Sequence, residues 1–368
     1  MHKILLLVPL VGNGGIASWA KKFMEMFPDD EFSFVPFSVN KRDKNEIYTS
    51  TIKRILSGIE DVFYLIKKLK SVINDNEIEI IHTTTSGSFG IIRDLIIGFM
   101  CKNKIETVLH CHYGNLPEKL NKRIWRYLTV KSMGFFSQIW VLDNKSLSSL
   151  KSFSVLSGKV FLTPNSFDVK PNLDIKKKNY DNVAFVGNII PTKGIYEVLE
   201  AVSKSSTIKM LHIIGPVPET EKSTFQERLS LLPPQKVKYY GRIPNEEVLE
   251  ILKGVDIICL PTYYPFEAFP ISILEAMALG KFVISTKRAA IPDMLTDING
   301  NSCGYFVREK SSEDIIQGFI WCYNHKSQAD LMCQKAYEKV YNFYRTEVVF
   351  ETYRQLYGKL VTIKECDN

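Results

Sequence analysis

The sequence predicts an α/β protein built from two doubly wound domains with parallel sheets. Short apolar runs rich in leucine and β-branched residues alternate along the chain with longer amphipathic stretches of helix length. Strands that are apolar on both faces are typical of parallel sheets covered by helices on either side. A polar stretch at about 168–182, which contains Pro171, divides the runs into two series and is expected to be a linker.

The expected elements follow in order along the chain. The first series contains six apolar runs, at 3–9, 32–39, 78–83, 106–112, 138–143 and 159–164, and the second contains five, at 182–188, 209–215, 237–241, 256–261 and 281–286. The stretch 330–363 has the pattern of a long helix whose aromatic residues form a packing surface. We therefore expect one domain at 1–168 and a second at 169–344, with a C-terminal helix of about 345–368 that packs back on the first.

Composition and targeting signals favour a cytoplasmic globular protein. The 368 residues are 45% hydrophobic and 24% charged, which excludes disorder and leaves ample material for a core. The seven cysteines form no CxxC pair or zinc spacing, so we expect buried thiols in a reducing compartment and no metal site. The apolar start of the chain runs into glycines, which favours a first strand over a signal peptide. No apolar run approaches the roughly 18 residues of a membrane span.

The positive charge is concentrated in the first half of the chain. Residues 1–165 hold 22 basic and 15 acidic residues, which accounts for the whole net charge of +7. Two interpretations stay open: a solvated basic face, or attraction to an anionic membrane surface or a phosphate-bearing substrate. The basic clusters, among them Lys41/Arg42/Lys44 and Lys119/Lys122/Arg123/Arg126, lack interleaved aromatic residues, so a nucleic-acid partner is not expected.

Candidate binding residues gather in the segment 261–285. An apolar strand is followed by a loop with Glu267, by Pro270 in a position suited to a first helical turn, and by a helix that ends at Gly280. Glu275 and Ser272 lie on one side of this otherwise apolar helix. A carboxylate there needs a hydrogen-bonding partner, which would be either ligand hydroxyls or a buried arginine. The helix N-terminus is suited to phosphate, so the segment fits a ligand with ribose, diphosphate and sugar.

The segment FEAFPISILEAMALGKFVIS contains an E-x7-E motif whose first residue is Glu267 and whose last is Glu275. This segment resembles the retaining glycosyltransferases of family four. The segments VAFVGNIIPTKGIYEVLEAV and YYGRIPNEEVLEILKGVDIICLPT before it, and IPDMLTDINGNSCGYFV after it, resemble the same family in the same order. In the first half, GNGGIASWA, ETVLHCHYG and KVFLTPNSFDV do so as well. The resemblance implies the GT-B fold, in which two Rossmann-like domains face a central cleft.

The resemblance also implies roles for individual residues. Glu275 would bind ribose hydroxyls, Glu267 the transferred sugar, and Lys193 the leaving diphosphate, while His112 would contact the sugar near the reacting carbon; His110 ranks second for that role. Backbone N–H groups from Phe269 through Pro270 and Ile271 to Ser272 would hold the diphosphate. Gly14 and Gly15 would let the backbone approach the donor or the acceptor, and Gly187 and Asn188 belong to the donor-binding loop. Asn188 stands where the family usually has arginine. Three alternatives stay open: Lys193 suffices, another cation such as Arg242 substitutes for the arginine, or the diphosphate contact is weaker.

The implied activity is a retaining, metal-independent transfer of a hexose from a nucleotide diphosphate donor, expected to be a UDP-sugar. No Asp-x-Asp motif occurs in the chain, which favours a reaction without a metal ion, and no cofactor is expected. The acceptor would be a hydroxyl of a glycan or of a lipid-linked glycan at the inner face of the cell membrane, in polysaccharide biosynthesis. Two alternatives remain on the same scaffold: a nucleotide-sugar 2-epimerase, and a non-catalytic nucleotide-sugar-binding protein.

Overall fold

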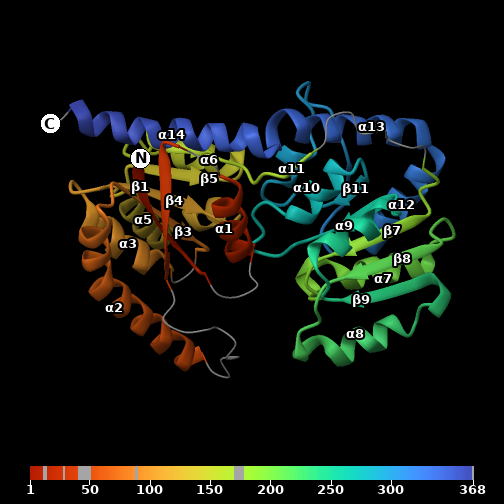
Figure 1. The fold of residues 1–368 in the computed structure, drawn as a ribbon. Helices are drawn as coiled ribbons and strands as arrows, with labels where there is room; N and C mark the ends of the chain where they lie inside the picture. Colours follow the sequence, from red (N-terminus) through yellow and green to blue (C-terminus); the bar gives the residue numbers. More distant parts are fainter. Residues whose placement is uncertain (11–14, 28–29, 40–50, 88–89, 170–177, 367–368) are drawn as a thin grey trace. The chain divides into compact units, whose positions relative to one another are not determined.

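The computed structural model describes residues 1–10, 15–27, 30–39, 51–87, 90–169 and 178–366. Its contacts divide the chain into two compact units (Figure 1). Unit 1 comprises residues 1–163 and 350–368, and unit 2 comprises residues 164–349. The expected domain limits at 168 and 344 lie a few residues from these divisions, while most of the expected linker, residues 170–177, lies outside the described residues.

Unit 1 contains a parallel sheet of six strands in the order β2-β1-β3-β4-β5-β6. The central strands are buried on both faces, as their apolar sequences predict; Ile4 to Val8 of β1 are wholly inaccessible. All six runs expected in the first half form strands, which are β1 (His2–Val8), β2 (Phe32–Ser38), β3 (Ile80–Thr85), β4 (Glu106–Cys111), β5 (Gln138–Val141) and β6 (Val160–Leu162).

Helices connect these strands and bury their apolar sides against the sheet. The helices are α1 (Gly15–Met26), α2 (Thr51–Asn76), α3 (Gly90–Cys101), α4 (Leu116–Leu120), α5 (Arg123–Met133) and α6 (Asn144–Lys151). The end of the last helix, α14 (Thr346–Cys366), belongs to the same unit. Its buried Tyr353 stacks on Trp140 of β5 with ring centroids 4.8 Å apart, and Tyr357 accepts or donates a hydrogen bond of 2.5 Å with His82 Nδ1.

Unit 2 contains a second parallel sheet of six strands, in the order β12-β11-β10-β7-β8-β9. Five of them are the runs expected in the second half. The strands are β7 (Asn182–Val186), β8 (Met210–Ile214), β9 (Val237–Gly241), β10 (Ile257–Leu260), β11 (Phe282–Ser285) and β12 (Tyr305–Phe306). The sheet order reverses between β7 and β10, and ligands of doubly wound sheets bind at such a point, outside the carboxyl ends of the strands.

Helices surround this second sheet as well. They are α7 (Ile195–Lys204), α8 (Lys222–Leu229), α9 (Asn245–Lys253), α10 (Ile271–Ala278), α11 (Ile291–Met294), α12 (Ser312–Asn324) and α13 (Lys326–Lys339), with short 3-10 turns η1 (Pro191–Lys193), η2 (Glu219–Glu221) and η3 (Pro234–Lys236). The helix α10, which was expected to be buried because it lacks a polar side, has Ile273 to Ala278 buried in succession. Its first residue, Ile271, is exposed.

The single long helix expected at 330–363 is two helices. A π-helical turn, η4 (Val340–Tyr344), follows α13, and Arg345 then adopts an extended conformation before α14 begins. Continuous amphipathic periodicity concealed this break, because neither proline nor glycine marks it. The expected packing role of the aromatic residues is confirmed for five of the six, which are buried: Tyr337, Tyr344, Phe350, Tyr353 and Tyr357.

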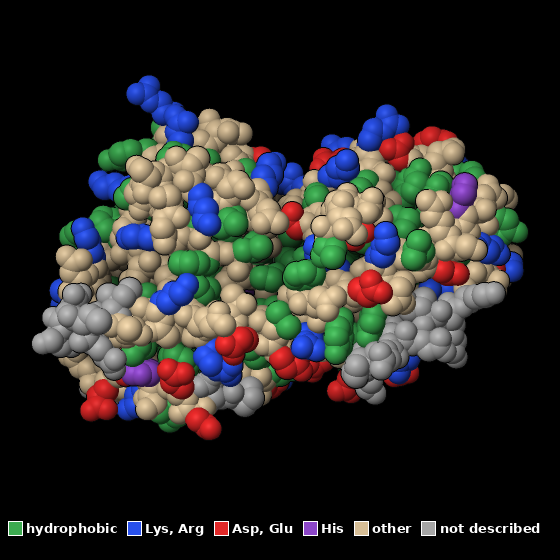
Figure 2. All heavy atoms as spheres, turned by 90° about the horizontal axis from the view of Figure 1, so that it is seen from above, with side chains coloured by type: hydrophobic (Ala, Val, Ile, Leu, Met, Phe, Trp, Pro, Cys, Tyr) green, Lys and Arg blue, Asp and Glu red, His purple; other side chains and the backbone are tan. Residues whose placement is uncertain are grey.

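Basic side chains are widely distributed over the surface. On the face drawn in Figure 2, Lys and Arg side chains are spread as separate groups, with hydrophobic side chains between them. The basic cluster Lys41/Arg42/Lys44 lies outside the described residues. Within the part of the chain that the structure describes, no helix is long and apolar enough to span a bilayer.

Candidate functional site

Glu267 lies in the loop between β10 and α10. The buried strand ends at Leu260, and the loop then turns tightly, because the N–H of Glu267 donates to the carbonyl of Tyr264 at 3.0 Å. The side chain of Thr286 donates to the carbonyl of Thr262 and so ties the start of this loop to the end of β11. The turn thus brings the carboxylate of Glu267 back toward the end of its own strand.

Lys193 lies in the loop after β7, and two contacts fix that loop against the end of β10. The carbonyl of Thr192 accepts a hydrogen bond of 2.8 Å from the N–H of Tyr263. Gly194, directly after Lys193, has a φ of +80°. It lies so close to Pro261 that an added Cβ would come within 2.5 Å of the Pro261 carbonyl oxygen. Only glycine allows this close approach.

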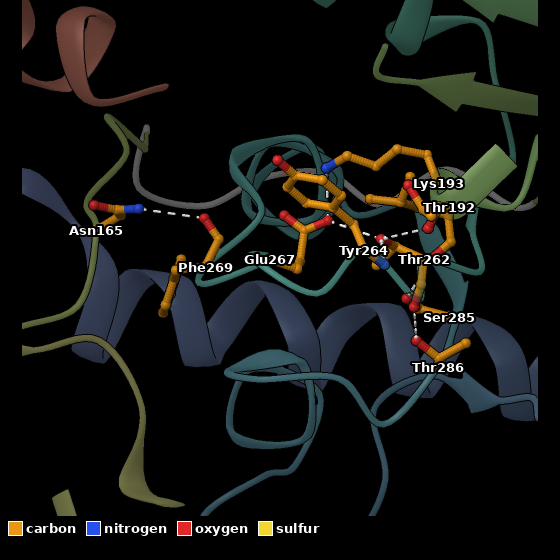
Figure 3. A network of polar contacts seen from close by, with 10 residues as sticks. Asn165, Thr192, Lys193, Thr262, Tyr264, Glu267, Phe269, Ser285 and Thr286 are labelled. Atoms are coloured by element: carbon orange, nitrogen blue, oxygen red, sulfur yellow. Dashed lines mark hydrogen bonds and ion pairs between the residues drawn. The ribbon is translucent and has the colours of Figure 1, made fainter. Parts of the chain in front are cut away.

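The two loops bring Lys193 and Glu267 into direct contact (Figure 3). Lys193 Nζ lies 2.6 Å from Glu267 Oε2, and the Thr262 hydroxyl donates to the same oxygen at 2.9 Å. The ammonium group also lies over the ring of Tyr264, 5.4 Å from its centroid. Only 16% of the lysine side chain and 8% of the glutamate side chain are exposed. The two residues given separate roles from the sequence therefore form one charge-paired unit.

The helix α10 begins at Ile271, four residues after Glu267. Pro270 is the residue that precedes the first helical turn, so the expectation that it lies within that turn is corrected by one position. It carries no N–H and cannot contribute a donor to the expected phosphate cradle. The N–H groups of Ile271 and Ser272 belong to the first turn, where a helix supplies no acceptor. The Asn165 side chain fixes the approach to the helix, since it donates to the carbonyl of Phe269 at 3.3 Å.

Glu275 lies one turn into α10, among residues that are fully buried. Its own exposure is 4%, and it has a polar interaction with the chain. Ser272, on the same side of the helix, is half-buried. The binding of ribose hydroxyls by Glu275 stays a prediction.

Gly187 and Asn188 follow β7 at the carboxyl edge of the sheet. The N–H of Gly187 donates to the carbonyl of Ile214 at 2.9 Å, and the loops after β7 and β8 approach so closely that a Cβ on Gly215 would lie 1.9 Å from the Gly187 carbonyl oxygen. Asn188 is exposed, as is Arg242 after β9. β9 is two strands away from β7, so Arg242 and Asn188 follow strands whose axes are about 10 Å apart.

His112 belongs to unit 1, where it follows β4. Its N–H donates to the carbonyl of Thr85 at 2.8 Å, and its ring lies 4.8 Å from Trp19 and 4.1 Å from His110. Burial lowers the pKa of His112 to about 3, so the imidazole is neutral, and no described residue is a hydrogen-bonding partner of its buried Nε2. A neutral imidazole serves as a hydrogen-bonding group for a sugar, not as a cation.

His110, the second candidate, lies deeper in the same unit. It is fully buried, its Nε2 lies 3.4 Å from the Thr163 hydroxyl, and burial lowers its pKa well below the ordinary value. Gly15 is the first residue of α1, and Gly14 lies outside the described residues. Trp19 of α1, which was not singled out from the sequence, covers the rings of both histidines.

Sequence reasoning also missed the supporting residues of unit 2. Thr262 and Tyr264 contact the Lys193–Glu267 pair, and Asn165 holds the backbone before α10. The segment that contains Asn165 was recognised by its resemblance, but the contact with Phe269 spans over a hundred residues of sequence. Within the described residues, no group of three His, Cys, Asp or Glu side chains is placed to hold a metal ion.

The fold and the site together define a class of protein. Two doubly wound parallel sheets form the GT-B fold, and solved structures support this over nearly the whole chain. Sucrose-phosphate synthase from Thermosynechococcus elongatus is similar with a TM-score of 0.78 and 15% identity, covering 99% of this chain and 100% of its own. Anabaena HepE, solved in complex with UDP-glucose, is similar with a TM-score of 0.70 and 18% identity, covering 98% and 100%.

Sequence comparison finds a family that is similar to the second half of the chain. Residues 169–339 match the family described as glycosyl transferases group 1. A putative teichuronic acid biosynthesis glycosyltransferase, TuaC of Bacillus subtilis, is 26% identical over 39% of this chain and 32% of its own length. Over residues 169–339 the chain is thus similar to the group 1 glycosyltransferases, and over nearly its whole length it has the GT-B fold.

A second relative is similar over a longer stretch. The N,N'-diacetylbacillosaminyl-diphospho-undecaprenol alpha-1,3-N-acetylgalactosaminyltransferase of Campylobacter jejuni is 23% identical over 52% of this chain and 47% of its own length. The matches thus span less than half the length of either curated relative.

Proposed function

We propose that this protein transfers a hexose from a nucleotide diphosphate donor, a UDP-sugar, to a hydroxyl of a glycan or lipid-linked acceptor, with retention of configuration at the sugar and without a metal ion. The reaction would serve the synthesis of a polysaccharide or glycoconjugate. The observation that carries the proposal is the Lys193–Glu267 pair, held by two loops directly before the N-terminus of α10.

The geometry of the pair suits a leaving diphosphate. Lys193 is a fixed cation, and charge that grows on the leaving phosphate in the transition state is stabilised by a cation already in place. The free N–H groups of Ile271 and Ser272 add the positive end of a helix dipole. Glu267 holds the ammonium at 2.6 Å before the donor binds, and its second carboxylate oxygen accepts hydrogen bonds from sugar hydroxyls.

The proposed step needs no base from the protein. The oxygen of the acceptor hydroxyl forms a bond to the anomeric carbon on the face from which the phosphate leaves, and the bond between that carbon and the phosphate oxygen breaks. The acceptor proton passes to the departing phosphate, so a nucleoside diphosphate and the glycoside are the products. Neutral His112 would donate or accept a hydrogen bond at the sugar. The protein therefore binds the substrates, orients them and stabilises the charge that develops between them.

The names of similar proteins support the choice of substrates. HepE was solved with UDP-glucose, and the Campylobacter relative is named for a diphospho-undecaprenol acceptor. By analogy we propose a UDP-sugar donor and a lipid-linked glycan acceptor, with the enzyme in the cytoplasm in peripheral contact with the anionic inner face of the membrane. The excess of basic residues in the first half of the chain is consistent with that contact.

A panel of nucleotide sugars tests the proposal. Purified protein is titrated with UDP-, GDP- and ADP-linked hexoses, and both slow hydrolysis and transfer to acceptors are followed. We expect one UDP-sugar to bind and to be hydrolysed, Lys193→Gln to lose turnover, and Glu275→Ala to weaken nucleotide binding. Lys204→Gln, which changes an exposed lysine of the same unit, is the matched control.

Each other outcome has a distinct meaning. Binding without hydrolysis or transfer would indicate a nucleotide-sugar-binding protein, and conversion of the donor alone to an isomer would indicate an epimerase. Unchanged affinity of Glu275→Ala would remove that residue from the ribose site. Failure of every donor to bind would overturn the proposal.

A further inference from the structure

The helix α5 of unit 1 is amphipathic, but its apolar side is exposed and does not pack against the rest of the unit. Ile124, Tyr127, Leu128 and Lys131 follow the i, i+3, i+4, i+7 spacing that normally marks the core side of a helix. Here that side is exposed: Ile124 is 74% and Tyr127 62% accessible. The buried positions of the same helix are instead Thr129, Ser132 and Met133.

The neighbouring helix α3 has the same inverted pattern. Ile92, Leu95, Ile96 and Phe99 repeat the spacing and are exposed or half-buried, with Phe99 70% accessible, while its buried residues are Asp94, Ile97, Gly98 and Cys101. The two helices pack together, and Gly98 of α3 lies against the turn that follows α5, where an added Cβ would come within 2.9 Å of Phe135. Figure 1 shows α3 and α5 beside each other in unit 1. We call the two exposed stripes the α3–α5 face.

The charge around this face has one sign. Residues 90–105 and 121–134 contain a single acidic residue, Asp94, which is buried and paired with Arg93 at 2.8 Å. The exposed charged side chains of these two segments are all basic: Lys102, Lys104, Lys122, Arg123, Arg126 and Lys131. A second copy of this chain would bring the same cations opposite one another, so charge complementarity favours an anionic occupant.

The arrangement of rings and lysines indicates what kind of anionic occupant fits. Lys131 Nζ lies 5.6 Å from the ring centroid of Tyr127, and Lys102 Nζ lies 5.6 Å from that of Phe135. Phe99 and Phe135 form an edge-to-face pair at 5.8 Å. These lysines extend along apolar rings and hold their charge at the edge of the apolar surface. Such an arrangement suits the boundary between acyl chains and anionic headgroups, where aromatic residues and lysines are favoured together.

We propose that the α3–α5 face is the surface by which this protein docks on an anionic lipid bilayer. Ile124, Tyr127 and Phe99 enter the headgroup layer, and the surrounding lysines and arginines contact lipid phosphates. The inference rests on the proposed function only in that a lipid-linked acceptor gives the docking a purpose; the surface itself is argued from the exposed stripes and their charge.

Vesicle sedimentation with the full-length protein tests the docking. The probes are vesicles of phosphatidylcholine alone and of phosphatidylcholine with phosphatidylglycerol, at low and high salt. We expect binding to the anionic vesicles only, weakened by salt. Arg126→Gln/Lys131→Gln should lower the partition coefficient about 25-fold, since each cation near such a surface contributes roughly fivefold. Phe99→Ser/Ile124→Ser should lower it by at least about tenfold through lost apolar burial.

Matched controls come from unit 2. Ile298→Ser/Leu331→Ser removes two apolar side chains that are also exposed, and Lys222→Gln/Lys253→Gln removes two exposed lysines. Both controls should bind anionic vesicles like the wild type. Equal binding by all variants, no binding by the wild type, or a dimer in solution that only the α3–α5 variants dissociate would overturn the docking surface.

A vesicle-free assay separates this inference from the proposed function. Donor binding and hydrolysis in solution should be unchanged in the α3–α5 variants, because none of the substituted residues belongs to the candidate site. If vesicle binding behaves as expected and no donor binds, the docking surface stands and the proposed reaction is wrong. If donors are hydrolysed and the protein does not bind the vesicles, the reaction stands and the docking surface is wrong.

Discussion

The buried Lys193–Glu267 pair allows a quantitative test by a double-mutant cycle. The variants are Lys193→Met, Glu267→Gln and the two combined. At 2.6 Å the gross attraction of two unit charges is about 6 kcal/mol for an effective dielectric constant of 20. Desolvation of both groups offsets a large part of it, and removing one partner of a buried pair costs up to about 3–5 kcal/mol because the other charge is left behind.

The magnitudes differ between the two single variants. In Lys193→Met the carboxylate of Glu267 keeps, among the described residues, only the Thr262 hydroxyl as a neutral donor. The free energy of unfolding of unit 2 should therefore fall by about 3 kcal/mol. In Glu267→Gln the ammonium keeps some contact with solvent, and the loss should be about 2 kcal/mol. The combined variant should lose about 3 kcal/mol, which leaves a coupling energy of about 2 kcal/mol.

Native-state hydrogen exchange of the β7 and β10 amides measures these losses within unit 2. That readout is preferable to a single global denaturation curve, because proteins with more than one unit often unfold in more than one step. A coupling energy below about 0.5 kcal/mol would mean that the two charges do not stabilise each other, and the reasoning that treats them as one unit would be refuted.

Three further outcomes follow from particular contacts. Gly194→Ala should lower the stability of unit 2 by about 3 kcal/mol, measured by native-state hydrogen exchange of the same amides, because the left-handed backbone and the 2.5 Å approach to Pro261 both oppose a side chain. Tyr357→Phe should cost about 1–3 kcal/mol, since buried His82 loses its hydrogen-bonding partner; an unchanged melting temperature would contradict this. Burial lowers the folded-state pKa of His82 and of His112 from 6.5 to about 3, so each histidine contributes stability that is present above pH 6.5 and lost as the pH falls toward 3. Urea unfolding between pH 7 and pH 5 should therefore show a loss of up to about 1.4 kcal/mol per pH unit per histidine, and a flat profile would contradict the neutral buried state.

The strands were predictable because a parallel strand that is covered on both faces consists of consecutive apolar residues, which are visible in the local sequence. Each apolar run that was expected to form a strand does so. The strand β12 was not expected, since Tyr305 and Phe306 are too few to give a pattern. The break at Arg345 between α13 and α14 was missed for the opposite reason: the helical periodicity continues through it, and the extended backbone there is set by tertiary contacts such as the bridge to Phe167.

The candidate site was predictable in its residue types but not in its contacts. A carboxylate in an apolar helix and a lysine after a strand are visible in the sequence, and the family resemblance assigned each a role. The contact of Lys193 with Glu267 depends on the relative placement of two loops 74 residues apart, which no local pattern records. The burial of His112 behind Trp19 is likewise a product of α1 packing on the end of β4.

The C-terminal helix α14 has a consequence for any attempt to divide this protein. It starts in unit 2 and supplies Phe350, Tyr353 and Tyr357 to the interior of unit 1. A fragment that stops at residue 163 would leave Trp140 and His82 without the rings that cover them, and we expect it to aggregate when expressed alone. A soluble fragment would require residues 350–366 to be fused to it, for example ahead of Met1 through a flexible tether, so that the chain order is rearranged and the interior stays complete.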